Sequence, residues 1–302
     1  MWVTSARAVT FACGLAVLAL GSGTRGGVMH ATGEPRFPVT DATSISRTLR
    51  FSGPGVPTLD LRAINGSIRV TGYSGSDVQL EAQTTIRAET DTDLAAARRE
   101  VVLDVADDAS TVGVTVRDAR YGICGEGRDG AGGRRARNRY LVTIDLTARV
   151  PVGSRLRLCT VNGREVSVSG TAGDFEIDNV NGRITMDRIS GSGRATTVNG
   201  GVTVSFVDAP REASQFKTVN GALEVSFPLD LAADLRMKTL NGGLFTDFDT
   251  QPLATTADPP ERRNGRFVYH ANRFTAVRVG RGGPRHTFET VNGDVRVFRV
   301  AG

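Results

Sequence analysis

The chain repeats one short motif, an aliphatic residue followed by Asn-Gly, and this repetition restricts its fold more than any other feature. Asn-Gly preceded by an aliphatic residue occurs seven times in 302 residues. Between Asn162 and Asn241 the spacings are 19, 18, 21 and 21 residues, which chance does not produce. Such a period indicates a repeat architecture. The asparagines of the seven predicted corners are Asn65, Asn162, Asn181, Asn199, Asn220, Asn241 and Asn292.

Each of these seven Asn-Gly pairs lies between two short segments in which apolar and polar residues alternate. After most copies comes one variable residue and then a pair such as Val202 and Val204, and residues 155–158 alternate upstream. A period of two indicates a β-strand with one buried face. The repeat unit is therefore predicted to be a strand, a corner and a second strand. The Asn162 copy has one extra residue before Val166, which a β-bulge would accommodate.

Two folds can use this unit. Asn-Gly between alternating segments is a strong signal for a type I′ hairpin, which would give an antiparallel meander. The other fold is a solenoid in which each unit forms one coil and identical corners stack. Similarity between successive corners favours the solenoid, because asparagine amides can hydrogen-bond along a stack. We therefore predict an all-β, single-stranded parallel β-solenoid with the corners in one or two rows, and a positive φ at Gly221.

The repeated units resemble a known family. The T-V-N-G units at 197–204, 218–225 and 290–297, together with residues 149–153 and 189–191, are similar to the DUF4097 family of adhesin-like proteins. The resemblance covers residues 45–302, and its specificity lies in the repetition. It implies a β-solenoid on an exported or envelope-associated protein. It supplies no established catalytic residues.

The first 23 residues have the pattern of a secretory signal peptide. Arg7 precedes the apolar run 8–20, which is followed by small residues at 21–23. Thirteen residues are too few to span a bilayer core of about 30 Å. The alternatives are an N-terminal anchor, a buried strand, or a lipoprotein modified at Cys13. We expect an exported protein of the periplasm or cell surface, without a transmembrane segment in the mature chain.

The rest of the chain is predicted to consist of a linker and one interrupted domain. Residues 24–44 are expected to be a loose linker, and 45–302 the adhesin-like solenoid. Insertions are expected at 91–100, 121–139 and 250–265. The first has acids at its start and arginines at its end, which is typical of a short helix. Further strands are expected at 101–105, 112–116 and 140–146.

Removal of the leader leaves two cysteines, Cys124 and Cys159. An even number of cysteines in an oxidising compartment permits a disulfide. The bond would close a loop of about 35 residues and stabilise the fold by a few kcal/mol. Two buried free thiols are the alternative.

Motifs for catalysis, metals and cofactors are weak. His30, His270 and His286 lack metal-site spacing, so we expect surface histidines, and two cysteines without CxxC exclude a conventional zinc site. Residues 125–130 match GxGxxG but open no helix. We expect no cofactor, metal or catalytic residue. A net charge of +5, from 37 bases and 32 acids, does not indicate nucleic-acid binding.

The glycine-rich segment 121–139 is the one basic cluster that stands out. It contains five arginines within 12 residues, facing two local acids. Such a cluster can bind anionic lipid headgroups or acidic glycans, or it can be a solvated loop. The candidate contact residues are Arg128, Arg134, Arg135, Arg137 and Arg139.

Three classes of function follow. The repeats and the export signal favour a non-catalytic binding or structural protein of the envelope, of the adhesin type. A second class is an envelope sensor that contacts a membrane partner. A polysaccharide-processing β-helix enzyme is the third, and it is disfavoured because the mature chain has no tryptophan to serve as a sugar platform.

Overall fold

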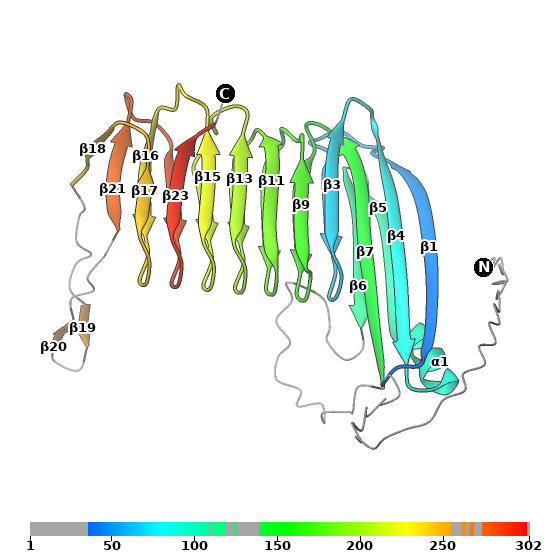
Figure 1. Ribbon diagram of the computed structural model, residues 1–302. Coiled ribbons are helices and arrows are strands. Elements are labelled where there is room, and N and C mark those ends of the chain that lie inside the picture. The colour runs from blue at the N-terminus through cyan, green and yellow to red at the C-terminus, as the bar shows by residue number, and fades with distance from the viewer. Residues whose placement is uncertain are drawn as a thin grey trace, which may run out of the picture. The chain divides into compact units, whose positions relative to one another are not determined.

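The computed structural model describes residues 36–108, 110–118, 124, 139–254, 261–263, 266–268 and 274–300. In this part of the chain the fold is all-β, with two mixed sheets, one two-stranded hairpin and a single helix, α1 (Asp91–Glu100) (Figure 1). The predicted signal peptide and most of the predicted linker lie outside the described residues. Strand β1 begins at Val39, so it takes in the end of the segment expected to be a linker.

The two large sheets have ten and eleven strands, and we call them sheet A and sheet B. Sheet A has the order β1 (Val39–Arg50), β4 (Asp77–Ala88), β7 (Tyr140–Pro151), β3 (Ile68–Tyr73), β9 (Glu165–Ser169), β11 (Arg183–Ile189), β13 (Val202–Phe206), β15 (Leu223–Phe227), β23 (Val295–Arg299) and β17 (Leu244–Thr246). Sheet B has the order β18 (Thr250–Pro252), β21 (Thr275–Val279), β16 (Ala233–Lys238), β22 (Arg285–Glu289), β14 (Ser214–Lys217), β12 (Gly193–Thr196), β10 (Phe175–Asn179), β8 (Arg155–Thr160), β2 (Thr58–Arg62), β6 (Thr111–Asp118) and β5 (Val101–Asp108). The hairpin consists of β19 (Glu261–Arg263) and β20 (Arg266–Val268).

Each of the seven predicted corners leads the chain from a strand of sheet B to a strand of sheet A. Strand β14 is thus followed by the Asn220 corner and then by β15, in the other sheet. Equivalent strands of neighbouring repeats pair in parallel, as β10 does with β12 and β11 with β13. The corners therefore do not close hairpins, and the antiparallel meander is excluded for the repeats.

A wholly parallel solenoid is nevertheless too simple a description, because both sheets are mixed. Strand β4 pairs antiparallel with β1 and β7 in sheet A, and β5 pairs antiparallel with β6 in sheet B. At the other end of sheet B, β21 is antiparallel to β16 and β18. These strands come from segments outside the repeat units, and among these antiparallel pairs only β5 and β6 are joined by a short turn.

The seven corner asparagines form one continuous row. In each step the side-chain amide Nδ2 donates to Oδ1 of the neighbouring asparagine, over 2.7 to 2.9 Å. The order in space is Asn65, Asn162, Asn181, Asn199, Asn220, Asn292 and Asn241. A second row runs beside it, in which the threonine before a corner donates to the glycine carbonyl of the next coil, as Thr218 Oγ1 does to Gly200 O at 2.7 Å.

The reason for glycine at the corner differs from the one expected at Gly221. Its φ is not among the positive values, whereas Gly182 has a φ of 146°. A Cβ atom built on Gly221 would lie 2.0 Å from the carbonyl oxygen of Gly200 in the neighbouring coil. Close approach of two backbones therefore requires glycine at position 221.

The extra residue in the Asn162 repeat does not produce a bulge in the sheet. Strand β9 pairs in continuous register with β3 and β11. The register shift in this region lies between Met186 and Ile189 of β11, where Arg188 has a φ of 48°. The extra residue is therefore accommodated before β9 begins.

The last repeat does not lie at the end of the row. Strand β22 pairs in parallel with both β14 and β16, and β23 pairs in parallel with both β15 and β17. Figure 1 shows β23 between β15 and β17, out of colour order. The final coil is thus inserted between two coils that are consecutive in the sequence.

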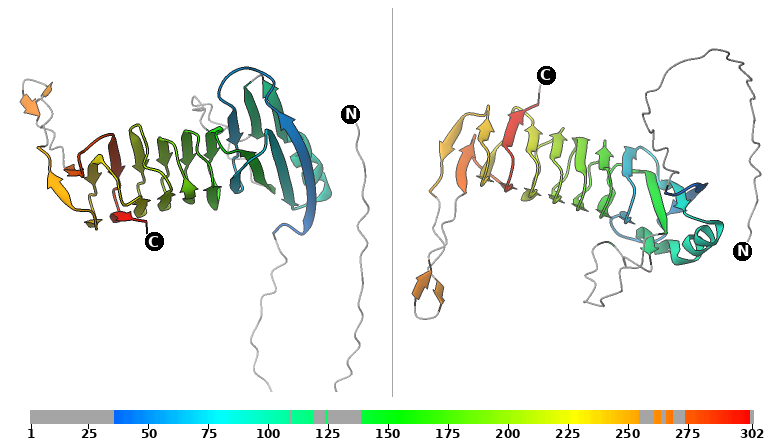
Figure 2. Two further views of the ribbon diagram at one scale, coloured as in Figure 1. Left: turned by 90° about the horizontal axis from the view of Figure 1, so that it is seen from above. Right: turned by 60° about the horizontal axis from the view of Figure 1, so that its bottom comes forward.

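The core lies between the inner faces of the sheets, which Figure 2 shows as two layers of strands. Phenylalanines from both sheets meet there: the Phe206 and Phe227 rings of sheet A stack at 5.0 Å, and those of Phe216 and Phe288 of sheet B at 5.5 Å. Phe206 also contacts Phe216 across the sheets at 6.2 Å. Because successive side chains of a strand point to opposite faces, the remaining side chains lie on the outer faces of the two sheets.

Helix α1 spans the predicted insertion 91–100. The side chain of Thr90 accepts a hydrogen bond from the backbone N–H of Asp93 and caps the first turn. The predicted strands at 101–105, 112–116 and 140–146 lie within β5, β6 and β7. In the predicted insertion 250–265 the structure has strands β18 and β19.

Candidate binding surface

Cationic side chains gather on the outer face of sheet B, on β14, β22, β16 and β21. The pairing register places Lys217, Glu289 and Lys238 in one row and Gln215, Thr287 and Arg236 in the next. A third row contains Arg285, Asp234 and Arg278. We call this surface the basic face, defined by these nine residues, of which five are cationic and two are carboxylates.

Glu289 is shared between the two lysines of the chain. Its carboxylate oxygens lie 3.2 Å from Lys238 Nζ and 3.4 Å from Lys217 Nζ. Burial by itself would raise the pKa of Glu289, but the hydrogen bond from Lys238 and the charge of Lys217 outweigh it and lower that pKa. One carboxylate thus neutralises only part of the charge of this row.

Asp234 and Arg278 form the second ion pair of the basic face. Arg278 Nε and Nη2 donate to the two oxygens of Asp234 at 2.8 and 3.0 Å, which is a bidentate arrangement. This hydrogen bonding lowers the pKa of Asp234 and raises the pKa of Arg278. Arg285 lies opposite Asp234 in the register and makes no ion pair or hydrogen bond of its own among the described residues.

An aromatic ring supports two of the cations. The guanidinium of Arg236 lies 4.6 Å from the centroid of the Phe274 ring, and Lys238 Nζ lies 5.2 Å from it. Cation–π contacts of this kind hold a cation without neutralising it. Within the described residues Arg236 has no carboxylate partner, so its charge remains available to a ligand.

A polar groove lies farther along sheet B. It has a volume of about 330 Å³ and is lined by residues of β8, β10 and β12 and their turns, including Arg157, Glu176 and Glu212. Arg194 beside it pairs with Glu176 at 3.1 Å and with Asp178 at 2.8 Å. Desolvation raises the pKa of Asp178 in spite of Arg194. The groove therefore offers both signs of charge, in contrast to the basic face.

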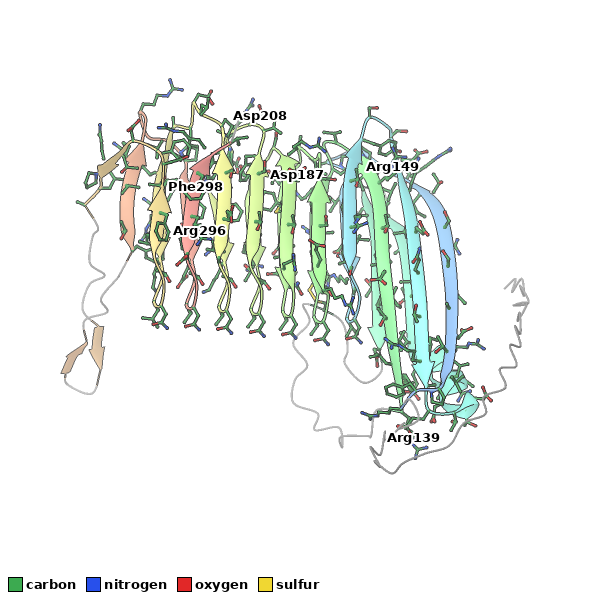
Figure 3. All side chains as sticks on the ribbon, viewed as in Figure 1. Arg139, Arg149, Asp187, Asp208, Arg296 and Phe298 are labelled. Atoms are coloured by element: carbon green, nitrogen blue, oxygen red, sulfur yellow. A yellow bond between two sulfur atoms is a disulfide. The ribbon has the colours of Figure 1, made fainter. Side chains whose placement is uncertain are left out.

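Most of the predicted arginine contact residues lie outside the described part of the chain. These are Arg128, Arg134, Arg135 and Arg137. Arg139 is described, and its Nη1 lies 3.8 Å from Asp93 Oδ1 of α1 (Figure 3 labels Arg139). The GxGxxG match at 125–130 also lies outside the described residues.

Cys124 and Cys159 are joined by a disulfide. Cys159 is in β8, so the bond attaches position 124 to sheet B. The Cα atoms are 5.8 Å apart.

The expectation of surface histidines is wrong for His286. This residue of β22 is fully buried, and its ring stacks on Phe227 with the centroids 5.4 Å apart. Neither ring nitrogen has a hydrogen-bond partner, and burial lowers the pKa of His286 to about 4. His30 and His270 lie outside the described residues.

The basic face was not predicted from the sequence, although the repeats contain part of the pattern that indicates it. Lys217, Lys238 and Glu289 each directly precede the threonine of a corner, so they occupy equivalent positions in three repeats. Alternation predicts that such positions point outward. What the sequence did not show is that the third of these repeats lies between the other two.

The described residues contain neither a cluster of metal-ligating side chains nor a membrane-spanning helix. No group of three or more His, Cys, Asp or Glu side chains is placed to hold a metal ion in this part of the chain. Over the same residues, no helix is long and apolar enough to cross a membrane.

Comparisons with known proteins give distant structural likenesses only. No family model matches the chain, and no curated protein matches it. One similar solved structure is a "putative cell adhesion protein" from Clostridium sporogenes, which is 7% identical, with 86% of this chain and 100% of that chain covered and a TM-score of 0.41. A "putative adhesin" from Bacteroides fragilis is 9% identical, with coverages of 85% and 97% and a TM-score of 0.33. A "putative lipid binding protein" from Parabacteroides distasonis is also 9% identical, with the same coverages and a TM-score of 0.25. Likenesses at this level indicate no function.

Proposed function

We propose that this protein is an exported, non-catalytic binding protein of the cell envelope, of the adhesin type, and that its basic face binds an acidic glycan. The observation that carries the proposal is the row-by-row register of five cations and two carboxylates on four adjacent strands. The apolar run at 8–20 supports export. The T-V-N-G units support membership of the DUF4097 family and a solenoid built from residues 155–299.

The rigidity of the sheet suits the basic face to a polymer. Parallel strands in a sheet lie about 4.8 Å apart, so the cations stand at fixed intervals along the direction of strand stacking. A rigid array loses little conformational entropy when a repetitive anion binds across it. Among the described residues Arg236 has no carboxylate partner, and Arg285 acts on Asp234 through its charge but forms no ion pair or hydrogen bond with it, so a ligand can bind both arginines without displacing an ion pair.

The neutral residues of the basic face favour a glycan over a lipid surface. Gln215 and Thr287 lie between the cations and carry an amide and a hydroxyl, which can hydrogen-bond to sugar hydroxyls and carboxylates. Peripheral insertion into lipid requires protruding apolar side chains. The ring of Phe274 is instead placed against Arg236 and Lys238.

The test is the affinity of the full mature protein for polygalacturonate at low and physiological salt. The variant R236S/R285S removes two cations without breaking an ion pair. We expect binding to weaken about 5- to 10-fold, since each exposed charge contributes up to about 1 kcal/mol. Added salt should weaken binding of the native protein, because it screens exposed charges.

The matched control is R69S/R183S. These two arginines are exposed on the outer face of sheet A and, in the described structure, form no ion pair. The control should bind like the native protein. Equal affinity of R236S/R285S and the control would overturn the proposal, and stronger retention on phosphatidylglycerol vesicles than on polygalacturonate would overturn the choice of a glycan.

A further inference from the structure

The inserted coil occupies a slot that the rest of the chain forms. Strands β14 and β15 form one side of the slot, and β16 and β17 form the other. Residues 285–299 fill it, with parallel pairing on both sides in both sheets. Figure 3 labels Arg296 and Phe298, which belong to the inserted strand β23.

The slot contacts the coil through side chains as well as backbone. Asn292 Nδ2 donates to Asn220 Oδ1, and Asn241 Nδ2 donates to Asn292 Oδ1, both at 2.7 Å. Thr290 Oγ1 donates to Gly221 O at 3.0 Å. These partners lie 51 to 72 residues from the inserted coil in the sequence. The coil is thus held entirely by distant parts of the chain.

Only the repeat at residues 285–299 has a glutamate at the position that faces the two lysines beside the slot. Lys217 and Lys238 border the slot, and Glu289 contacts both. At the equivalent position the other repeats have Arg62, Cys159, Asp178, Thr196, Lys217 and Lys238. Asp178, the one other acid, pairs with Arg194 in its own part of the sheet. The slot is therefore selective for the sequence of the last repeat.

The coil is connected to the preceding strand by a short glycine-rich hinge, residues 280–284. Gly280 and Gly282 have φ values of 57° and 75°. The hinge crosses the beginning of β16, where the N–H of Asp234 donates to Pro284 O at 3.1 Å and a Cβ on Gly283 would lie 2.5 Å from Ala232 O. Strand β16 thus lies between β21, which precedes the hinge, and β22, which follows it.

We propose that the slot also accepts residues 285–299 of a second copy of this chain, so that two copies exchange their last coils. Until the coil arrives, the slot exposes unpaired strand edges on both sides, which is the condition under which strands pair between chains. A second copy offers the same glutamate, asparagine and threonine in the same register. Exchange through a short hinge is an established route from monomer to dimer.

The experiment uses two full-length variants, Q215C and T287C, each of which carries one introduced cysteine. Gln215 of β14 and Thr287 of β22 are register partners, so a disulfide between positions 215 and 287 reports on the slot. The two variants are mixed, unfolded and refolded together in a glutathione redox buffer at increasing protein concentration. Each carries only one of the two thiols, so every bond between positions 215 and 287 joins two chains.

We expect a cross-linked dimer whose yield rises with protein concentration. Because the two variants pair at random, roughly half of the exchanged dimers contain one copy of each variant and can form the bond. The control mixture is R194C with Q215C, which are register partners in the consecutive strands β12 and β14, and it should give no cross-linked dimer through these positions.

The double variant Q215C/T287C shows whether positions 215 and 287 lie side by side in one chain. It should form the bond within one chain at low concentration. If it does so while the mixture of single variants yields no dimer at any concentration, exchange does not occur. If the double variant fails to form the bond, the insertion itself is wrong and the proposal falls with it.

Discussion

Glu289 Oε1 lies 3.2 Å from Lys238 Nζ although 51 residues separate them in the sequence. On its other side Glu289 contacts Lys217 at 3.4 Å. The only two lysines of the chain thus lie on either side of the inserted coil and share one carboxylate. Glu289 therefore both contacts the strands on either side of the inserted coil and reduces the positive charge of the basic face.

Replacement of Glu289 by glutamine should strengthen binding to an acidic glycan. The change leaves both lysines without their carboxylate, so the basic face gains positive charge. We expect tighter binding to polygalacturonate by about 3- to 10-fold and a loss of at most about 1 kcal/mol in stability, since these groups are partly exposed. D294N, which removes a carboxylate directly before β23 and away from the basic face, is the control. Unchanged affinity of E289Q would count against the basic face.

The stability of the protein should fall between pH 6.5 and pH 4 because of His286. Its pKa in the folded state is about 4, below the ordinary value of 6.5, so the unfolded chain binds the proton first as the pH falls. The free energy of unfolding should decrease by about 3 kcal/mol over this range and change no further through this group below pH 4.

The control for this pH effect is H286L, since leucine occupies the neighbouring register position 235. Denaturant unfolding at several pH values should give a smaller slope for H286L than for the native protein. Parallel curves for the two proteins would show that His286 is not buried in its neutral form.

Replacement of Asn179 by threonine should stabilise the protein. Asn179 occupies the position before the corner where other repeats have threonine, and it is buried with no hydrogen-bond partner for either side-chain atom. Threonine should donate to the carbonyl of the neighbouring coil, as Thr218 does, with a gain of about 1 to 2 kcal/mol. T218A should lose about 1 kcal/mol in the same thermal melts. A lower melting temperature for N179T would refute this account of the threonine row.

Replacement of Gly221 by valine should destabilise far more than the same change at Ala222. A side chain at position 221 meets the Gly200 carbonyl, and the coils would have to separate. We expect a loss of about 3 kcal/mol for G221V and under about 1 kcal/mol for A222V. Equal melting temperatures would show that the corners do not stack closely.

The local structure of the repeats could be predicted from the sequence, because period two and the Asn-Gly corner are local signals. The pattern at 202–206 places Val202 and Val204 inward, and both are buried. The same alternation places His286 inward beside Phe288, but the expectation of a surface residue rested on the lack of metal-site spacing and did not use this alternation.

The order of the coils could not be predicted, for a physical reason. Thr290-Val291-Asn292-Gly293 has the same sequence as the corners at 197–200 and 218–221, so any slot in the row satisfies its backbone and amide. Only long-range contacts, such as Glu289 with the lysines, specify the slot. The basic face depends on that order, and so it was not foreseen.

The most direct test of the proposed function is photo-cross-linking in the native envelope. A photoreactive amino acid is placed at Thr287 on the basic face in one strain and at Thr203 on the outer face of sheet A in another. After fractionation, the Thr287 probe should capture carboxylated glycan in the exported fraction, and the Thr203 probe should capture little. Equal capture from both faces, or recovery of the protein only in the cytosolic fraction, would contradict the proposal.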